Sequence, residues 1–285
     1  MGRSFVEVVM KRGLVLLMAV VMVGAAACSQ GDEDDESSGG KATSSSASST
    51  STTAPSTSST SSTSSTTTAP PSTTTTASTV PPGPPQPGAS GPDVQALQRR
   101  LEELHYWVGP TDGRYGELTK QAVYAFQKVN GLPVDGKVGP ATQAKLDHPV
   151  APPHQSASGV VWEVDKARQV LMVVRDGQVL WIWNTSTGTE KPYVHEGVRH
   201  MADTPVGHLT FTREIDGWRK APLGMIYRPK YFHPDGIAIH GYSHVPPYPA
   251  SHGCVRLTNP AMDAVWATGL ATVGTPIWVY GQSPV

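Results

Sequence analysis

A long run of serine and threonine dominates the first third of this 285-residue chain. Between residues 43 and 79, 30 of the 37 residues are Ser or Thr, and residues 80–92 add six prolines. Such a composition cannot bury enough apolar surface to offset the entropy that a chain loses when it becomes ordered. We therefore expect residues 28–92 to form a disordered tether. The remaining 193 residues, 93–285, suit one or two small domains.

The charge of the folded part excludes one broad class of function. Beyond residue 92 the chain has 17 acidic and 18 basic residues, a net charge of +1. Nucleic-acid-binding domains carry a basic face that neutralises phosphates, so we expect no nucleic-acid partner. Past the N-terminal region, the sequence has no apolar stretch long enough to span a bilayer.

Residues 1–27 are typical of an export signal. Basic residues precede an apolar run and four small residues: Arg3, Lys11 and Arg12, then Leu14–Val23, then 24–27. A cysteine directly after the small residues resembles the lipobox of bacterial lipoproteins. The resemblance implies that Cys28 becomes the lipidated first residue, which would anchor the protein to the outer face of the cytoplasmic membrane, at the cell wall. The alternative is an ordinary secreted protein that is cleaved near Ala27.

The number of cysteines gives a second indication. The chain has two cysteines, Cys28 and Cys254. If Cys28 carries a lipid, Cys254 has no partner for a disulfide. An unpaired thiol in an exported protein favours a reactive cysteine.

A repeated pattern marks the first folded segment, 93–147. Residues 112–119 and 135–142 share an Asp-Gly turn, a second glycine and the start of a helix, 23 residues apart. Apolar residues at helical spacing precede and separate the two repeats: Val94, Leu97, Leu101, Leu104, Ala122, Val123, Phe126 and Val129. We expect three short helices. The pattern resembles the peptidoglycan-binding type 1 domain, which implies a non-catalytic module that holds the protein on the wall; the alternative is a packing module without affinity for a ligand.

After a Pro-containing linker at 148–158, short runs rich in Val, Ile and Trp indicate strands. The expected strands are 160–164, 170–174, 179–183, 209–215, 236–242 and 275–280. A tight hairpin at 175–178 joins two of them, and one helix is expected at 260–268 with Asn259 as its N-cap. The predicted fold is thus α+β and multidomain, with a three-helix module followed by a mainly β domain at 159–285.

The residues with catalytic potential lie late in this β domain. Cys254 follows His240 by 14 residues, after a Pro-rich loop. A thiol nucleophile needs a base that titrates near neutrality, which His provides, and the base needs an acceptor that fixes its tautomer. We predict Cys254 as nucleophile, His240 as general base and acid, and the Gly241 carbonyl as the acceptor. Gly253, beside the nucleophile, leaves backbone donors uncrowded for an oxyanion.

His240-Gly241 and the run from Ser251 to Arg256 resemble the signature of L,D-transpeptidases with the YkuD-type catalytic fold. Ser186-Thr187-Gly188 and residues 204–207 support the resemblance, which covers 159–281. It implies a cofactor-free reaction in which Cys254 attacks a tetrapeptide stem between its third residue, usually meso-diaminopimelate, and its terminal D-Ala. The side-chain amine of an acceptor stem then resolves the thioester into a 3→3 cross-link.

The resemblance also implies secondary roles. His252 is expected to shape the site or line its oxyanion region, while Ser251 and Arg256 steady the loop. Carbapenems are expected to acylate the nucleophile as mimics of the stem peptide.

Three other functions are compatible with the same residues. If water resolves the thioester, the enzyme is an L,D-carboxypeptidase. His240, His252 and Cys254 could instead be the ligands of a zinc peptidase. The β domain could also be a degenerate part of a non-catalytic wall-binding adaptor.

Overall fold

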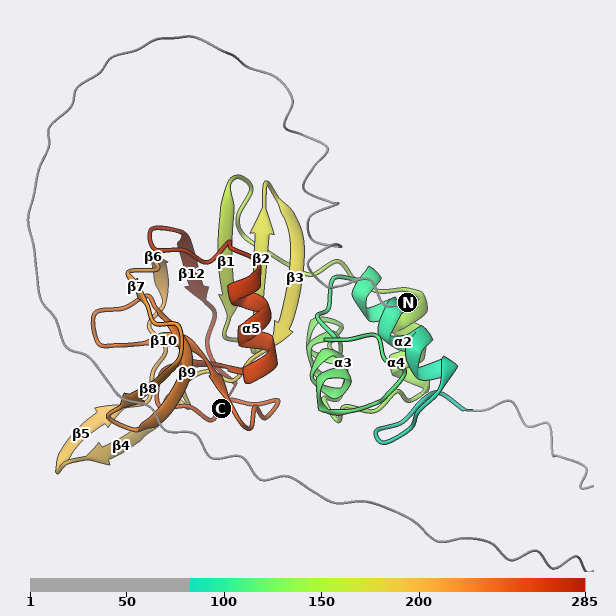
Figure 1. The fold of residues 1–285 in the computed structure, drawn as a ribbon, viewed down its shortest axis with the longest axis horizontal. Helices are drawn as coiled ribbons and strands as arrows, with labels where there is room; N and C mark the ends of the chain where they lie inside the picture. Colours follow the sequence, from blue (N-terminus) through green and yellow to red (C-terminus); the bar gives the residue numbers. More distant parts are fainter. Residues whose placement is uncertain (1–82, 285) are drawn as a thin grey trace, which may run out of the picture. The chain divides into compact units, whose positions relative to one another are not determined.

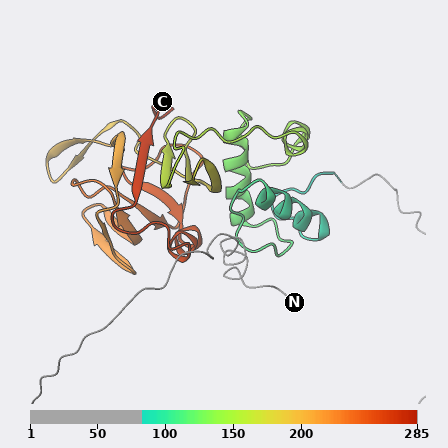
Figure 2. The ribbon, with the colours of Figure 1, turned by 90° about the horizontal axis from the view of Figure 1, so that it is seen from above.

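The structure, a computed structural model, describes residues 83–284. The predictions for the export signal, for Cys28 and for residues 28–82 of the tether lie outside these residues. The last part of the expected tether is ordered instead: Gly88 N donates to Tyr115 O at 3.0 Å, Gly91 N donates to Gly113 O at 2.8 Å, and the first helix begins at Pro92. The described part begins with a helical module and continues into a mainly β domain (Figures 1 and 2), which confirms the predicted fold class. Its helices are all too short or too polar to cross a membrane.

The helical module contains α2 (Pro92–Glu103), α3 (Glu117–Val129) and α4 (Pro140–Asp147). Prolines lie in the first turns of α2 and α4, where a missing N–H removes no intrahelical hydrogen bond. A buried glutamine holds each Asp-Gly turn of the repeat. The Gln98 side chain accepts from Gly113 N at 2.8 Å, and the Gln127 side chain accepts from Gly136 N at 2.9 Å. The 23-residue repeat thus reflects two turns that are held by the same side-chain contact.

Two sheets form the β domain. The first has the order β3-β2-β1-β12-β6, and the second has the order β11-β10-β9-β7 with β8 paired to β9. A separate hairpin consists of β4 and β5. The bounds are β1 Val160–Asp165, β2 Val170–Arg175, β3 Gln178–Asn184, β4 Pro192–His195, β5 Val198–Met201, β6 Gly207–Thr210, β7 Arg213–Glu214, β8 Trp218–Ala221, β9 Gly224–Tyr231, β10 Ala238–Tyr242, β11 Val255–Thr258 and β12 Pro276–Tyr280.

One helix, α5 (Asn259–Ala267), packs among these strands. Its N-cap is Thr258, so the prediction of Asn259 was wrong. Thr258 has extended backbone angles at the end of β11, and its hydroxyl accepts from Ala261 N at 3.3 Å. The helix therefore begins one residue earlier than expected, with Pro260 still inside its first turn.

The expected strand 209–215 was also wrong, because the chain changes sheets inside it. Phe211 N donates to Thr275 O, next to β12 in the first sheet, whereas Thr212 N donates to Tyr231 O of β9 in the second. The sequence therefore divides into β6 and β7. Strands β4, β5, β8, β9 and β11 were not predicted, and β9 contains Pro229, a residue that weakens a strand pattern.

Both faces of the first sheet are buried near α3. In β2, Leu171 and Val173 belong to the core of the β domain, while Val170, Met172 and Val174 share a second core with the helical module. This alternation is the period-two pattern of a strand that is covered on both faces. Two backbone hydrogen bonds also join the module to β3: Trp107 N donates to Ile182 O at 3.0 Å, and Ile182 N donates to His105 O at 2.8 Å.

A buried lysine from the module completes this interface. Lys128 of α3 donates from Nζ to Gln169 O at 2.8 Å, to Thr185 O at 3.3 Å and to the Asn184 side chain. Burial lowers the pKa of Lys128 well below its ordinary value. Gln169 O also accepts from Thr185 N at 3.1 Å, so loss of the lysine would remove the donor chiefly from the Asn184 side-chain oxygen and Thr185 O.

We predict that Lys128→Ala lowers the free energy of unfolding by about 2–3 kcal/mol, because buried acceptors lose their donor. Since module and β domain share a core, the variant and the wild type are both expected to unfold in one transition. Chemical denaturation followed by far-UV circular dichroism and Trp fluorescence measures both quantities. Lys137→Ala, at an exposed position of the same module, is the matched control. Separate transitions for the two parts would contradict the shared core.

Candidate active site

The pairing of two parallel strands sets the predicted base and nucleophile on one face of a sheet. Register pairs Ile239 with Val255 and His240 with Arg256 across β10 and β11. Ile239 and Val255 point into the main core, so His240 and Arg256 occupy the opposite face of the sheet. Cys254 lies two residues before Arg256 and shares this face. Diagonal neighbours on one sheet face lie roughly 7–8 Å apart, within reach of aromatic and long side chains.

The His240 ring is held in one orientation. Its side chain is 3% exposed, and Nδ1 lies 2.9 Å from Gly241 O. Because a carbonyl only accepts, Nδ1 carries the proton and Nε2 keeps its lone pair. Burial lowers the pKa of His240 to about 4, assisted by the positive charge of Arg256 and opposed by the Gly241 hydrogen bond. The ring is therefore neutral at pH 7 and able to accept a proton at Nε2.

Close packing explains why glycine follows His240. A Cβ at Gly241 would lie 2.6 Å from Asn259 Oδ1 and 2.8 Å from Tyr227 Cδ1. A side chain at this position would force the side chains of Asn259 and Tyr227 to move. Gly241 therefore contributes a carbonyl for the histidine and a space for its neighbours.

The Cys254 thiol is partly buried, and Sγ lies 4.0 Å from Gly236 O. Burial raises the pKa of Cys254, while a hydrogen bond from the backbone of Ala238 and the charge of Arg256 oppose that rise. The resting pair consequently has a protonated thiol and a neutral imidazole. Such a pair requires that the proton move to His240 as the sulfur attacks.

Ser251 closes the turn that presents the nucleophile. Its hydroxyl accepts from Gly253 N at 3.0 Å and donates to Cys254 O at 2.5 Å. Gly253 has a φ of 140°, in the region that favours glycine. A Cβ on Gly253 would lie 2.8 Å from both Asp203 O and Ile237 Cδ1. Ser251 and Gly253 are thus required by the shape of this turn.

Arg256 anchors the loop between base and nucleophile. Its Nη1 donates to Ala250 O at 2.9 Å, and the guanidinium lies 4.3 Å from the centre of the Tyr242 ring. Its charge lowers the pKa values of both His240 and His252. Arg256 therefore combines a structural contact with an electrostatic effect on the site.

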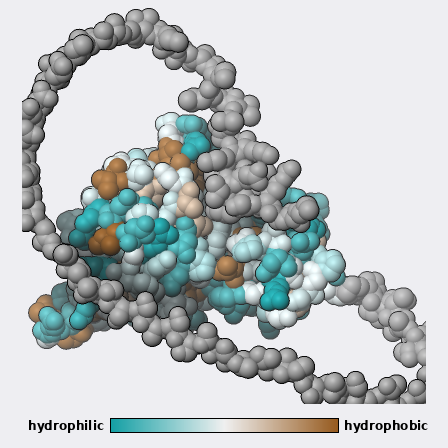
Figure 3. Space-filling model, in the orientation of Figure 1, coloured by the Kyte–Doolittle hydropathy of each residue, from teal (hydrophilic) through white to brown (hydrophobic). Residues whose placement is uncertain are grey.

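The structure places His252 against the β4–β5 hairpin. The exposed His252 ring packs edge-on against Tyr193 of β4, with ring centres 4.6 Å apart. Burial is the main cause that lowers the pKa of His252, and the positive charge of Arg256 lowers it further. The β4–β5 hairpin beside it also carries exposed apolar side chains, Val194, Val198 and Met201, which are 56–70% exposed. Figure 3 shows hydrophobic and hydrophilic residues together at this tip. His252 thus connects the turn that carries Cys254 to this hairpin.

Sequence reasoning missed two contacts that hold the active-site loop. Gln121 of α3 donates to Val245 O at 2.8 Å, and Thr187 O accepts from Ala250 N and Ser251 N at 3.1 and 3.0 Å. Thr187 lies in the Ser-Thr-Gly motif, which was the available signal for it. No sequence signal indicated the contact of Gln121, because its acceptor lies 124 residues away in the chain.

The proposed zinc ligands are not grouped as a metal site. Within residues 83–284, no three His, Cys, Asp or Glu side chains are placed to hold a metal ion. His240 already directs Nδ1 to Gly241 O, and His252 packs on Tyr193. The side chains present therefore give no support to the zinc peptidase alternative.

Three family models match the chain. PG_binding_1, a peptidoglycan binding domain, matches residues 90–146, and YkuD, the L,D-transpeptidase catalytic domain, matches residues 159–279. A third, the New glue protein family, matches residues 10–100, which include the tract of Ser and Thr. The helical module and the β domain thus correspond to two different family patterns.

Curated relatives match shorter segments. The chain is 45% identical over 76 residues to an uncharacterized protein of Kitasatospora aureofaciens, covering 26% of this chain and 59% of that protein. It is 46% identical over 61 residues to the spore cortex-lytic enzyme of Bacillus cereus, covering 21% and 24%. The chain therefore spans less than two thirds of either relative.

A solved structure matches over a greater length. The crystal structure of an L,D-transpeptidase from Xylanimonas cellulosilytica is 46% identical with a TM-score of 0.67, and the match covers 70% of this chain and 98% of that chain. Seventy per cent of 285 residues is about 200, more than the 121 residues of 159–279, so the similarity extends beyond the catalytic domain. On this similarity, together with the matching catalytic domain, the chain belongs to the L,D-transpeptidase family.

Proposed function

We propose that this protein is a peptidoglycan L,D-transpeptidase that forms 3→3 cross-links, with Cys254 as nucleophile and His240 as base. The observation that carries the proposal is the neutral His240 ring, which is fixed by Gly241 O and shares a sheet face with the thiol. Membership of the family supplies the reaction class. The helical module, with its match to a peptidoglycan binding domain, is proposed to hold the enzyme on its polymeric substrate.

The first half of the reaction forms a thioester. The sulfur of Cys254 attacks the carbonyl between the third residue of a donor stem and its terminal D-Ala, and the thiol proton passes to Nε2 of His240. Charge develops on the carbonyl oxygen, which needs backbone N–H donors near the nucleophile. The carbon–nitrogen bond then breaks, and D-Ala leaves with the proton that His240 returns to its amine.

The second half transfers the acyl group. The side-chain amine of an acceptor stem attacks the thioester carbonyl and gives a proton to His240. The carbon–sulfur bond breaks, and His240 returns the proton to the sulfur, so the enzyme regains its resting state. If water replaces the amine, the same intermediate yields a carboxypeptidase product.

We further propose that the protein is exported and anchored through a lipid on Cys28, after removal of residues 1–27. Residues 28–82, the part of the predicted 28–92 tether that precedes the ordered segment, would then lift a binding module (93–147), a linker (148–158) and the catalytic domain (159–285) toward the wall. The support for this is the sequence pattern. As a flexible coil, the tether would span roughly 45 Å.

Variants of the two central residues test the proposed chemistry. Incubation with meropenem followed by intact-mass spectrometry is expected to show one covalent adduct on the wild type and none on Cys254→Ala. His240→Gln is expected to slow acylation by about 10²–10⁴-fold, because the general base is lost. His208→Gln, at an exposed position on β6, is the control and should react like the wild type. An adduct that persists on Cys254→Ala would sink the assignment.

The pH profile tests the electrostatics of the pair. Acylation needs neutral His240, and its pKa is lowered to about 4. The acylation rate of the wild type should therefore stay level as the pH falls through 6.5 and decline only near pH 4. Stopped-flow measurement with meropenem, alongside circular dichroism to confirm folding at each pH, gives this profile. A decline centred near pH 6.5 would show an ordinary, solvated histidine.

The tether is tested in cells. Removal of residues 43–82, which spares the segment bonded to the helical module, is expected to leave acylation of the purified protein unchanged and to reduce the share of 3→3 cross-links in the wall, because the anchored domain loses reach. Muropeptide analysis measures the cross-links, and radiolabelled palmitate tests the lipid on Cys28. Unchanged cross-linking in the shortened protein would show that the reach is not needed.

A further inference from the structure

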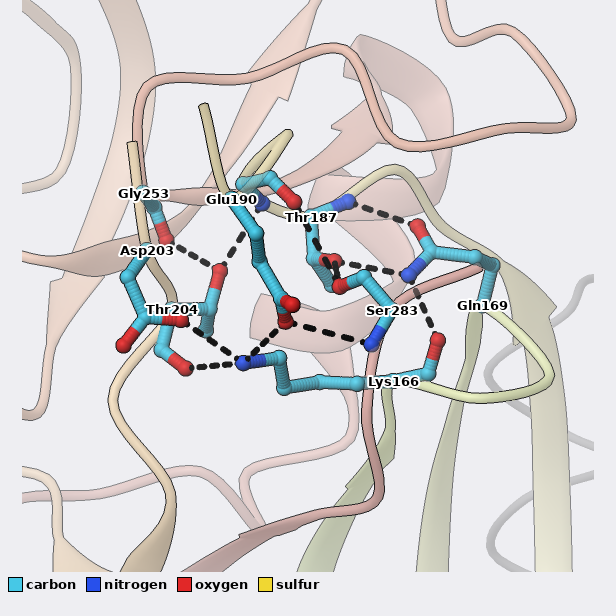
Figure 4. Close-up of polar contacts among 9 residues, drawn as sticks. Lys166, Gln169, Thr187, Glu190, Asp203, Thr204, Gly253 and Ser283 are labelled. Carbon is cyan, nitrogen blue, oxygen red and sulfur yellow. Dashed lines mark hydrogen bonds and ion pairs between the residues drawn. The ribbon is translucent and has the colours of Figure 1, made fainter. Parts of the chain in front are cut away.

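A buried polar network links Lys166, through Thr204, to Gly253, the residue before the nucleophile (Figure 4). Lys166, whose side chain is 3% exposed, lies just after β1. Its Nζ contacts Asp203 Oδ1, Glu190 Oε1 and Thr204 O, each at 2.8 Å. Glu190 also accepts from Ser283 N at 3.1 Å. One buried cation thus fixes the backbone of the segment that contains Thr204.

Thr204 passes this constraint to the nucleophile. It is fully buried, and its hydroxyl accepts from Gly188 N at 2.9 Å and donates to Gly253 O at 2.6 Å. A Cβ at Gly188 would lie 2.2 Å from Ala202 O. The segment 202–204 therefore runs tightly between two glycine-containing turns, and its position relative to Cys254 is closely set.

The direction of one N–H group depends on this hydroxyl. The peptide between Gly253 and Cys254 is planar and trans, so the Cys254 N–H points opposite to Gly253 O. Because Thr204 holds Gly253 O on one side, the Cys254 N–H is directed to the other side, away from Thr204. Ser251 holds the following carbonyl, Cys254 O, at 2.5 Å. Both peptide groups that flank the nucleophile are thus fixed through their carbonyl oxygens.

We propose that Thr204, supported by Lys166, is a positioning residue that aligns the Cys254 N–H as a donor to the oxyanion of the acylation step. The inference rests on the proposed function, because it assumes that Cys254 attacks a carbonyl. A donor fixed before the reaction stabilises the developing charge without reorganisation, whereas a freely rotating peptide does not. Thr204 acts through the Gly253–Cys254 peptide and need not touch the substrate.

Two reagents separate this role from a general effect on the fold. Meropenem acylation passes through an oxyanion, whereas iodoacetamide alkylates the same sulfur at a saturated carbon without one. Both are applied to the full chain, and peptide mass spectrometry locates the modification at Cys254. The ratio of the two rates reports the oxyanion donor, because thiol access and ionisation affect both reactions.

Thr204→Val keeps the shape of the side chain and removes the donor. We expect it to slow acylation by meropenem about 100-fold, with alkylation by iodoacetamide staying within about twofold of the wild type. Thr204→Ser, which keeps the hydroxyl, should retain acylation within about threefold. Lys166→Met should slow acylation by less than Thr204→Val does, and its rate of alkylation should likewise stay close to that of the wild type.

Each other outcome overturns a defined part of the account. Equal losses in both reactions, or Ser and Val variants that behave alike, would reduce Thr204 to a structural residue. Normal acylation of Thr204→Val would overturn this inference alone. A wild type that meropenem does not acylate, but iodoacetamide alkylates, would overturn the proposed function and this inference with it. If Thr204→Val does not fold, Lys166→Met and Thr204→Ser are compared instead. A positioning role predicts a lower ratio of acylation rate to alkylation rate in Lys166→Met than in Thr204→Ser, and equal ratios would overturn it.

Discussion

The parallel pairing of β10 with β11 is the constraint on which the site depends. It sets His240 beside Arg256 and leaves Cys254 on the same face, two residues away. Two other features support this arrangement. The absence of a side chain at Gly241 leaves room for the side chains of Asn259 in α5 and Tyr227 in β9, and the Ser251 hydroxyl closes the turn before β11. A shift of one residue in this register would send base and nucleophile to opposite faces of the sheet.

The same burial that fixes His240 also decides its charge. A neutral ring and a protonated thiol differ from a preformed thiolate–imidazolium pair, because neither catalytic group is charged before substrate arrives. Arg256 contributes to this state, since its positive charge disfavours a second cation on His240. The site is consequently built to move a proton during attack, which requires that the oxyanion donors already be in place.

The sequence predicted the parts of this protein that depend on neighbours along the chain. The structure contains the Asp-Gly repeats, the strands β1–β3 that were predicted from runs of Val, Ile and Trp, and the hairpin at Arg175–Gln178. Each of these is determined by residues close together in the chain. The change of sheets at Phe211 and Thr212 could not be predicted, because it depends on which distant strand each residue meets. The same holds for Gln121, whose acceptor at Val245 belongs to another module.

The candidate site divides in the same way. The motif around Cys254 indicated its residue types, since a nucleophile, a base and a flanking glycine are recognisable at short spacing. The contacts that position them come from Tyr227, Asn259 and Thr204, which only the tertiary fold brings near. Thr204 lay in a recognised motif, but its contact with Gly253 O became visible only once the segment 202–204 was seen between two turns.

Incubation of the purified protein with disaccharide-tetrapeptide tests the central claim most directly. Mass spectrometry of the products should show dimers joined by a 3→3 bond, with one D-Ala released for each cross-link, and Cys254→Ala should form neither. Release of D-Ala that yields only tripeptide would identify a carboxypeptidase that uses the same thioester. Dimers formed by Cys254→Ala would contradict the account.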